Sequence, residues 1–293
     1  MVNLRRVGVL ANLEKSGVKD AFARIQAWSS ENGYELTANM LIAHEGPSLG
    51  NPFGVEAAKL KQMFCNVDVL ISLGGDGTLL FASELAAPAG VPVLSVNLGS
   101  LGFHTQVGPD DLGDCLNRMS SGNYVIEKRM MLQTSLEDSN AEAHLALNDI
   151  VISKSAWGHM VTLRLSIDGA VLTDISADAL IVSSPTGSSA YNYAAGGPVV
   201  YPAMDALILN ALCAHRMRVT PVVVPPDSKL TVSLRPRRPE DFAQVLTDGQ
   251  PWHSMTDSET LKISRADVYL PLIVFENDFY GKLRDKLRWG GLF

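Results

Sequence analysis

The chain has 293 residues, of which 46% are hydrophobic and 19% are charged, a composition typical of globular proteins and a length sufficient for two domains. The formal net charge of −7 excludes a general basic face for nucleic acid or anionic lipid. No segment reaches the roughly 18 consecutive apolar residues of a membrane span, and three widely spaced cysteines fit neither a disulfide framework nor a metal site. We therefore expect a cytoplasmic protein with no nucleic-acid or membrane partner.

The first ~125 residues alternate between strand and helix patterns. The predicted elements, in chain order, are a strand at 6–11, a helix at 16–33, a strand at 34–39, a helix at 55–64, a strand at 67–73, a helix at 78–88, a strand at 91–97 and a helix at 109–123. Ser16 is the expected cap of the first helix. This alternation is typical of βαβ units, so it predicts a parallel or mixed sheet with helices on both faces.

From Tyr124 onward the pattern changes to short strands with apolar residues at every second position. Residues 161–167 and 170–175 flank Asp168-Gly169, which predicts a hairpin with a primed turn. Further strands are expected at 179–184, 221–225, 229–236, 244–250 and 261–266, with one helical turn at 203–215. This half is predicted to be an antiparallel all-β, sandwich-like domain.

The change of pattern predicts an α/β domain over residues 1–124 and an antiparallel β domain over residues 125–272. Residues 273–293 return to a helical pattern, in which Tyr280, Leu283 and Leu287 share one face. We expect this carboxyl-terminal helix to pack back on the first domain.

The sequence Gly-Gly-Asp-Gly-Thr at residues 74–78 lies between a buried strand and a helix. Ligands of open α/β sheets bind at the carboxyl ends of the strands, where glycines allow backbone amides to approach a phosphate. The alternative interpretation is a tight turn with a capping aspartate, but such a turn needs fewer glycines. The loop lacks the Rossmann fingerprint and the Walker A lysine, so it predicts a phosphate site of another kind. Its carboxylate, Asp76, points to a ligand with a hydroxyl group or a cation.

A second polar cluster occupies residues 183–200, where serines, a threonine, a tyrosine and glycines are concentrated. Such a cluster suits a nucleotide, and it suits equally well a loop rich in turn-forming residues. The serine-hydrolase motif G-x-S-x-G is absent, and none of the six histidines forms a close pair or the H-E-x-x-H motif. The cluster alone therefore leaves both interpretations open.

Taken together, five segments of the chain resemble the NAD kinases. They are GGDGT (74–78), LGFHT (101–105), LNDIVI (147–152), PTGSSAYNYAAGGP (185–198) and DGQ (248–250). GGDGT also occurs in lipid kinases and in the phosphofructokinase group, so the specificity comes from the TGSxAY segment followed by Gly-Gly-Pro. The resemblance extends over about the whole chain. It implies an α/β domain, a β-sandwich-like domain, and assembly as homodimers or homotetramers.

The resemblance also implies a reaction and its site. The family transfers a phosphoryl group from ATP, or in some bacteria from polyphosphate, to the adenosine ribose 2′-hydroxyl of NAD, with Mg²⁺ as the divalent cation. Asp76 corresponds to the catalytic carboxylate, which would accept the hydroxyl proton. The implied binding residues are Gly75, Gly77, Asn148, Asp149, His159, Ser176, Asp178, Thr186, Gly187, Ser188, Ser189, Ala190, Tyr191 and Gln250.

The chain departs from the family pattern at three positions. Asp149 replaces the usual glutamate, Ala179 replaces a glycine, and Ser176 stands where some members carry arginine. An uncharged residue at 176 implies that NADH is accepted beside NAD⁺. Two other functions stay open from the sequence, a lipid kinase with a GGDGT loop and a non-enzymatic NADP sensor. The first lacks a membrane-facing signal and the second is not expected to keep Asp76.

Overall fold

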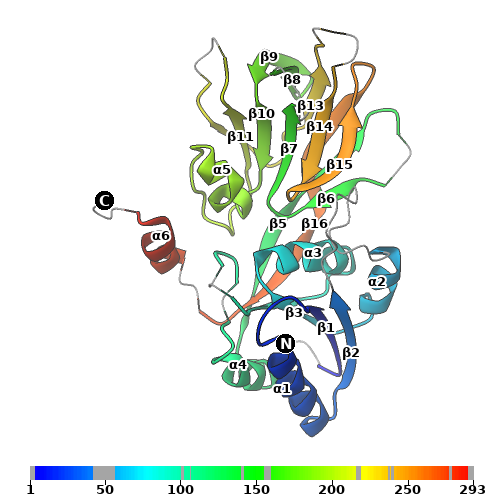
Figure 1. Cartoon of the computed structure of the whole chain (residues 1–293), viewed down its shortest axis with the longest axis vertical. Coiled ribbons are helices and arrows are strands. Elements are labelled where there is room, and N and C mark those ends of the chain that lie inside the picture. The colour runs from blue at the N-terminus through cyan, green and yellow to red at the C-terminus, as the bar shows by residue number, and fades with distance from the viewer. Residues whose placement is uncertain are drawn as a thin grey trace. The chain divides into compact units, whose positions relative to one another are not determined.

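The computed structural model describes residues 4–41, 57–99, 102–105, 107–139, 142–154, 160–215, 219–236, 238, 241–276 and 279–289. The chain divides into two compact units (Figure 1). The first unit contains the described residues up to Lys128 and those from Leu270 onward, and the second runs from Arg129 to Tyr269. The domain limits predicted at residues 124 and 272 stay predictions. In the structure, strands β5 (Val125–Leu136) and β16 (Thr260–Val274) each contribute residues to both units.

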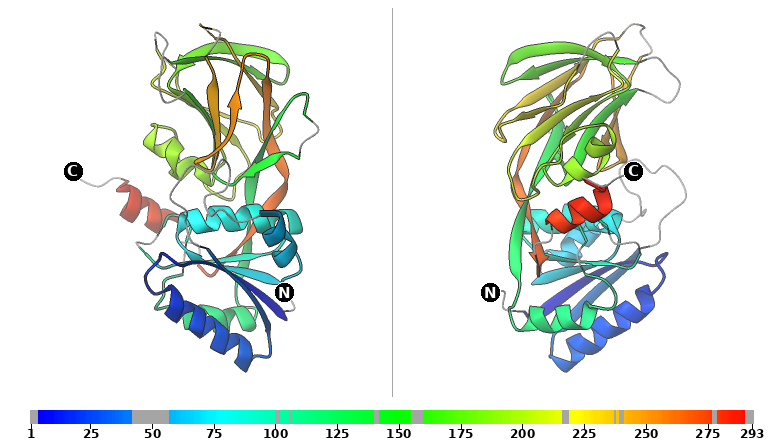
Figure 2. Two further views of the ribbon diagram at one scale, coloured as in Figure 1. Left: turned by 45° about the vertical axis from the view of Figure 1, so that its right-hand side comes forward. Right: turned by 90° about the vertical axis from the view of Figure 1, so that its left-hand side faces the viewer.

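The first unit is built on a parallel sheet with the strand order β2-β1-β3-β4. Its elements are β1 (Arg6–Asn12), α1 (Val18–Glu31), β2 (Glu35–Leu41), α2 (Ala57–Phe64), β3 (Val69–Gly74), α3 (Asp76–Ala86), a 3₁₀ turn (Ala87–Ala89), β4 (Val93–Asn97), α4 (Leu112–Ser120) and α6 (Phe279–Leu287). Helices α1 and α4 cover one face of the sheet, and α2 and α3 cover the other (Figure 1, Figure 2). This confirms the predicted α/β architecture.

The central strand β3 explains the apolar run before the glycines. All residues from Val69 to Gly74 are buried, as expected for a parallel strand covered on both faces. Side chains of β1, β3 and β4 on one face pack against apolar residues of α1 and α4 in a single core cluster. The sheet therefore holds the carboxyl end of β3 in a rigid framework.

The second unit is an antiparallel sandwich. Its elements are the last part of β5, β6 (His144–Ala146), β7 (Asp149–Lys154), β8 (Val161–Ile167), β9 (Ala170–Ala177), β10 (Ala179–Ser183), a 3₁₀ turn (Gly187–Ser189), α5 (Tyr191–Ala194), β11 (Leu207–Leu212), β12 (Val222–Val224), β13 (Leu230–Leu234), β14 (Ala243–Thr247), β15 (Gln250–Met255) and the first part of β16. One sheet has the order β12-β11-β10-β7-β14-β15, and β8 pairs with β9 and β13 in the other. Inward residues of both sheets form one core, which confirms the predicted sandwich.

Turn chemistry explains one confirmed and one wrong prediction. Asp168 and Gly169 both have positive φ, 51° and 81°, so the hairpin between β8 and β9 has the predicted primed turn. Only the end of the strand predicted over 244–250 is wrong, because β14 (Ala243–Thr247) stops three residues earlier. Asp248 and Gly249 also have positive φ, 50° and 78°, and separate β14 from β15. The same Asp-Gly signal is present at both places.

Three helix predictions also need correction. Residues 203–215 contain strand β11, whose backbone pairs with β10 on one side and with β12 on the other. Helix α1 begins at Val18, and no side chain caps it, because Gly17 in the left-handed conformation leads into it in place of Ser16. On α6, Tyr280 is 73% exposed, whereas Leu283 and Leu287 are half-buried, so the predicted apolar face is covered only in part. None of the helices in the described part of the chain combines the length and apolar character needed to cross a membrane.

Candidate active site

The site residues predicted from the sequence fall into two clusters, one in each unit. In the first unit, β3 ends at Gly74, and α3 begins at Asp76, two residues earlier than predicted, so Asp76 lies in the first helical turn. Gly75 precedes the helix in an extended conformation and accepts the first helical hydrogen bonds through its carbonyl. A carboxylate in the first turn interacts favourably with the helix dipole. The glycine-rich segment thus presents Asp76 at the carboxyl end of the central strand.

The Asp76 carboxylate is held from the opposite side by the segment 102–105. The backbone N–H of Phe103 donates to Asp76 Oδ2 at 3.0 Å. A Cβ atom on Gly102 would lie 2.1 Å from Asp76 Oδ1, so only glycine permits this approach. Oδ1 itself is buried and has no hydrogen-bond partner within the described residues. The arrangement leaves one oriented, buried carboxylate oxygen without a hydrogen-bond partner among the described residues.

The second cluster surrounds Asn148 and Asp149, at the start of β7. The carboxylate of Asp248 accepts hydrogen bonds from the backbone N–H groups of Leu147 (2.8 Å), Asn148 (2.7 Å) and Asp149 (3.2 Å). In return, the Asp248 N–H donates to the Asp149 carbonyl at 2.9 Å. The turn between β14 and β15 therefore fixes the backbone of this pair. Asn148 is 7% exposed, and its Oδ1 atom has no partner in the part of the chain that the structure describes.

The segment 183–190 packs directly against Asn148. The Ser184 N–H donates to the Asn148 carbonyl at 2.8 Å, and the Gly187 N–H donates to Ser184 Oγ at 3.1 Å. A Cβ atom on Gly187 would lie 2.0 Å from the Asn148 carbonyl oxygen. Thr186 is 2% exposed, and its hydroxyl finds no partner among the described groups. Because buried polar groups are normally paired, the free atoms of Asn148 and Thr186 indicate a site for a polar ligand.

The hydroxyl-rich segment divides into structural and accessible residues. Ser188 is fully buried, and its Oγ bonds with the Pro185 carbonyl (2.6 Å) and the Val200 N–H (2.9 Å), so its side chain serves the fold. Ser189 Oγ donates weakly to the Thr186 carbonyl at 3.3 Å. Ala190 is half-buried, and Tyr191, the first residue of α5, is exposed.

Ser176 and Asp178 lie at the end of β9 and immediately after it. The Ser176 hydroxyl lies 2.8 Å from Thr162 Oγ1. The Asp178 carboxylate accepts a hydrogen bond from Lys154 Nζ at 2.7 Å, with both side chains about one-third exposed. Gln250 opens β15, two residues after Asp248. His159 lies outside the described residues.

The pKa of Asp149 is raised to about 7, chiefly by burial and additionally by the neighbouring Asp248 carboxylate. The ordinary value is 3.8. Between pH 3.8 and about pH 7, Asp149 is protonated in the folded protein and ionised in the unfolded chain. The free energy of unfolding therefore falls as pH rises through this window, by at most about 1.4 kcal/mol per pH unit.

We expect Asp149→Asn to remove this pH dependence. The free energy of unfolding would be measured with urea at a series of pH values from about 4 to about 8. The difference between the variant and the natural protein should shift in favour of the variant as pH rises to about 7, and should stay constant above that pH. Asp257→Asn, in an exposed turn of the same unit, is the matched control. A constant difference between Asp149→Asn and the natural protein across the series would contradict the raised pKa.

The described side chains form no metal-binding cluster. No group of three or more His, Cys, Asp or Glu side chains in the described ranges is arranged to hold a metal ion. Mg²⁺ commonly keeps several water ligands and binds through the phosphates of a substrate, so it needs no such group. The residues thus fit a cation that arrives on a nucleotide.

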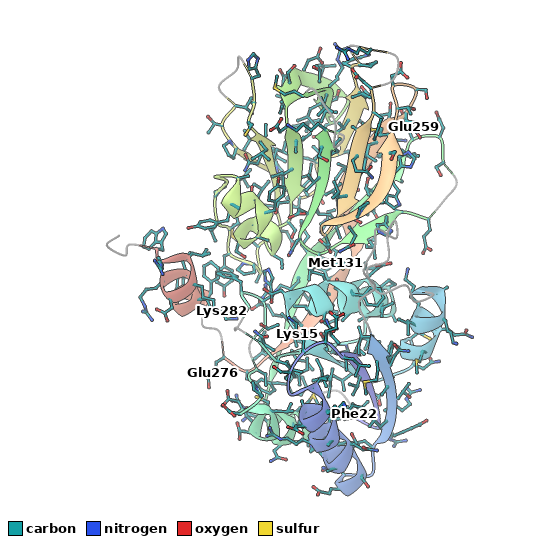
Figure 3. The ribbon with its side chains drawn as sticks, in the orientation of Figure 1. Lys15, Phe22, Met131, Glu259, Glu276 and Lys282 are labelled. Atoms are coloured by element: carbon teal, nitrogen blue, oxygen red, sulfur yellow. The ribbon has the colours of Figure 1, made fainter. Side chains whose placement is uncertain are left out.

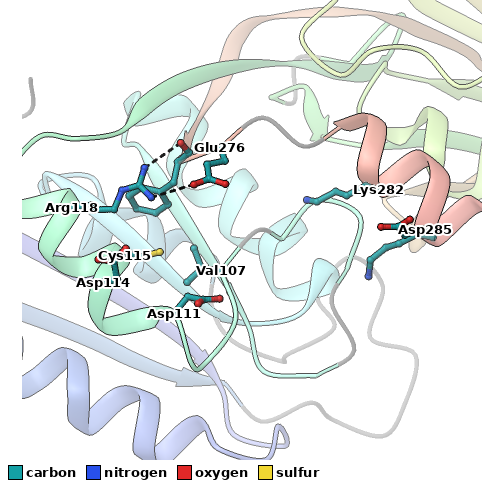
Figure 4. A pocket seen from close by; sticks show the side chains of 10 residues that line it. Val107, Asp111, Asp114, Cys115, Arg118, Glu276, Lys282 and Asp285 are labelled. Atoms are coloured by element: carbon teal, nitrogen blue, oxygen red, sulfur yellow. Dashed lines mark hydrogen bonds and ion pairs between the residues drawn. The ribbon is translucent and has the colours of Figure 1, made fainter.

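A cavity of about 500 Å³ in the first unit lies apart from the predicted site residues (Figure 4). Its lining comes from α4, from α6 and from residues 107, 111, 275 and 276. The guanidinium group of Arg118, which lines the cavity, already has protein partners. It donates to the Phe275 carbonyl at 3.3 Å and lies 3.8 Å from the Glu276 carboxylate. Burial raises the pKa of the Cys115 thiol to about 11, which keeps it protonated near neutrality.

Sequence reasoning missed the residues that position the others. Asp248 and Gly102 belong to the quoted segments DGQ and LGFHT, so the motifs contained a signal for both. Ser184 belongs to the polar cluster predicted at 183–200, whereas Lys154 carried no signal, because a lysine in a strand is common. Their roles come from contacts between residues distant in the sequence.

Comparisons with known proteins match both halves of the chain to one family. Residues 7–124 match the model of the ATP-NAD kinase N-terminal domain, and residues 147–275 match that of the ATP-NAD kinase C-terminal domain. Proteins named NAD kinase from Moorella thermoacetica and Heliobacterium modesticaldum are 37% and 38% identical to this chain. These alignments cover 98% and 97% of this chain and 91% and 99% of those proteins.

Two solved structures have a similar fold. An NAD kinase from Archaeoglobus fulgidus in complex with ATP aligns with a TM-score of 0.71 and 25% identity, over 95% of this chain and 98% of that one. Yeast NADH kinase complexed with NADH aligns with a TM-score of 0.80 over 99% of this chain and 89% of that one. At 22% identity, the second comparison supports the fold alone.

Proposed function

This chain belongs to the NAD kinase family, and from that premise we propose that it phosphorylates the adenosine ribose 2′-hydroxyl of NAD with ATP, giving NADP and ADP. The observation that carries the proposal is the Asp76 carboxylate, in which Oδ2 is fixed by the Phe103 N–H and Oδ1 has no hydrogen-bond partner among the described residues. A free, oriented carboxylate oxygen is what a hydroxyl needs before it attacks a phosphate.

In the proposed reaction, Asp76 Oδ1 accepts a hydrogen bond from the 2′-hydroxyl. The 2′-oxygen forms a bond to the γ-phosphorus of ATP as the bond from that phosphorus to the β–γ bridging oxygen breaks, and ADP leaves. The hydroxyl proton passes to Asp76. A carboxylate is a weak base for an alcohol, so the orientation that Gly102 and Phe103 impose contributes as much as the proton transfer.

The second cluster supports the binding of NAD. Asn148 Oδ1 and Thr186 Oγ1 are buried polar atoms without hydrogen-bond partners in the described part of the chain, and they lie on segments that contact each other through Ser184 and Gly187. Their chemistry suits the hydroxyl and amino groups of a nucleoside. In this proposal Tyr191 adds a ring for stacking, and Asp178 faces the nicotinamide end.

Mg²⁺ enters the proposed reaction as part of the ATP substrate. It would neutralise the charge of the donor phosphates and be held there by phosphate oxygens and water, since Asp76 Oδ1 accepts the hydrogen bond of the 2′-hydroxyl. We also propose that the protein acts in the cytoplasm as a homodimer or homotetramer, as the family resemblance implies. Light scattering on the purified protein measures the assembly, and a monomeric mass would contradict it.

The test of the function is direct. Purified protein incubated with ATP, Mg²⁺ and NAD should form NADP, detected with an NADP-specific dehydrogenase. Replacing ATP by polyphosphate identifies the donor, and replacing NAD by diacylglycerol or sphingosine tests a lipid kinase. Binding of NADP without any turnover would support a sensor in place of an enzyme.

We expect the protein to phosphorylate NADH as well as NAD⁺. The two substrates differ in the nicotinamide ring, which carries a positive charge only in NAD⁺. Ser176 carries no charge, and Lys154 largely neutralises Asp178 at 2.7 Å, so neither side chain selects strongly for the cation. Undetectable NADH phosphorylation by the natural protein would contradict this expectation.

The contribution of the ion pair can be isolated with Lys154→Met, which leaves the Asp178 carboxylate unpaired. The ratio of kcat/KM for NAD⁺ to kcat/KM for NADH should rise roughly fivefold, as expected for about 1 kcal/mol between two charges some 4 Å apart in a water-like dielectric. Lys262→Met, which breaks an exposed ion pair with Glu137 in the same unit, should leave the ratio unchanged.

A further inference from the structure

We infer that Lys282, on the carboxyl-terminal helix α6, is a positioning residue for the Asp76 carboxylate. The inference rests on the proposed function, since it assigns the residue through its effect on turnover. Lys282 and Asp76 are connected through the segment 102–105. Figure 3 shows Lys282 on α6.

The connection begins at the Lys282 ammonium group. Its Nζ donates to the carbonyl of Phe103 at 2.9 Å and to the carbonyl of Thr105 at 3.0 Å. Figure 4 shows the side chain extending from α6 toward the segment that precedes α4. A cation that bonds two carbonyls of one short segment fixes the orientation of both peptide groups.

The connection ends at the carboxylate. Phe103, whose carbonyl is held by Lys282, also donates its N–H to Asp76 Oδ2. The neighbouring Gly102 approaches Asp76 Oδ1 so closely that no Cβ fits between them. A rotation of this backbone would therefore lengthen the bond to Oδ2, press on Oδ1, or do both. The position of Asp76 is thus determined by the segment 102–105 as well as by α3.

Other contacts keep the segment folded when Lys282 is removed. The Gly102 N–H donates to Thr105 Oγ1 at 3.0 Å, and Thr105 is fully buried. The Phe103 ring packs edge-on against Phe279 of α6, with ring centroids 6.2 Å apart. The cavity of Figure 4 lies beside Lys282 and offers space to a substituted side chain. Loss of the ammonium group should therefore loosen the two carbonyls without unfolding the unit.

The experiment compares Lys282→Met, which keeps the length of the side chain, with Lys282→Arg, which keeps the charge and can donate to both carbonyls. Lys282→Met should lower kcat by roughly 10- to 100-fold, the effect of misplacing a reacting group by about 1 Å. The dissociation constant for NAD should change little, and Lys282→Arg should recover most of the lost turnover. Lys286→Met, an exposed lysine one turn further along α6, is the control and should retain full turnover.

A double variant separates positioning from a general structural role. In the Asp76→Asn background the carboxylate is already absent, so adding Lys282→Met should lower kcat no further. Hydrogen exchange of a peptide containing residues 102–105 should be faster in Lys282→Met than in the natural protein.

The possible outcomes decide between the hypotheses. Provided that the natural protein forms NADP, an unchanged kcat in Lys282→Met would overturn the positioning role. A kcat in the double variant that is reduced by the product of the two single losses would overturn it as well. Absence of NADP formation by the natural protein would overturn the proposed function instead. In that case the exchange measurement still tests whether Lys282 holds the segment.

Discussion

Asp76→Asn is expected to lower NADP formation by roughly 10²- to 10⁴-fold, the usual contribution of a positioned general base. Asparagine has nearly the same shape, so its carbonyl oxygen can keep the bond from the Phe103 N–H at 3.0 Å. Its NH₂ group then occupies the position of Oδ1, where it can donate but cannot accept the hydroxyl proton. The fold and the affinity for NAD should both be retained.

Three measurements check this expectation: initial rates of NADP formation, the dissociation constant for NAD, and the urea unfolding curve. Asp110→Asn, an exposed aspartate in the same unit, is the matched control and should remain fully active. Turnover of Asp76→Asn within a few-fold of the natural rate would remove Asp76 from the catalytic role. A large loss of stability would mean that the variant reports on folding.

Gly187→Ala is expected to impair both stability and the use of NAD. The added Cβ would lie 2.0 Å from the carbonyl oxygen of Asn148 and 2.4 Å from its carbonyl carbon, which are backbone atoms held by β7. Either the segment 183–190 or the start of β7 must move. Overpacking of this kind costs about 1–3 kcal/mol of the free energy of unfolding. A shift of about 1 Å at Asn148 should also lower kcat/KM for NAD by roughly 10²-fold.

The comparison variant for this prediction is Gly108→Ala. The nearest atom to its new Cβ would be a carboxylate oxygen of Asp111 at 3.6 Å, an ordinary contact, so its stability and kcat/KM should stay close to the natural values. Natural kinetics in Gly187→Ala would show that the pair Asn148–Asp149 tolerates displacement. That result would argue against the second cluster as the NAD site.

The sequence by itself determined the class of each unit, because periodicity reports which side chains are buried. The run from Val69 to Leu73 required a strand covered on both faces, and the alternation in residues 161–167 required one apolar face. Asp168-Gly169 determined a primed turn, since few residues tolerate positive φ. The same reasoning would have found the turn at Asp248-Gly249. The family motifs supplied Asp76 and the Asn148 pair as candidates, although periodicity gave them no role.

Only the tertiary structure decided how those candidates are held. The apolar stretch at 203–215 suits a helix or a strand, and pairing with β10 and β12 selected the strand. Asp248 reaches Asn148 across 100 residues, and Lys282 reaches Phe103 across 179, so neither contact leaves a local pattern in the sequence. Hydrogen bonds of this kind depend on where the fold brings a side chain to a backbone group that is distant in the sequence. Local preferences therefore fix the elements, whereas the packing of distant segments fixes the orientation of the reactive groups.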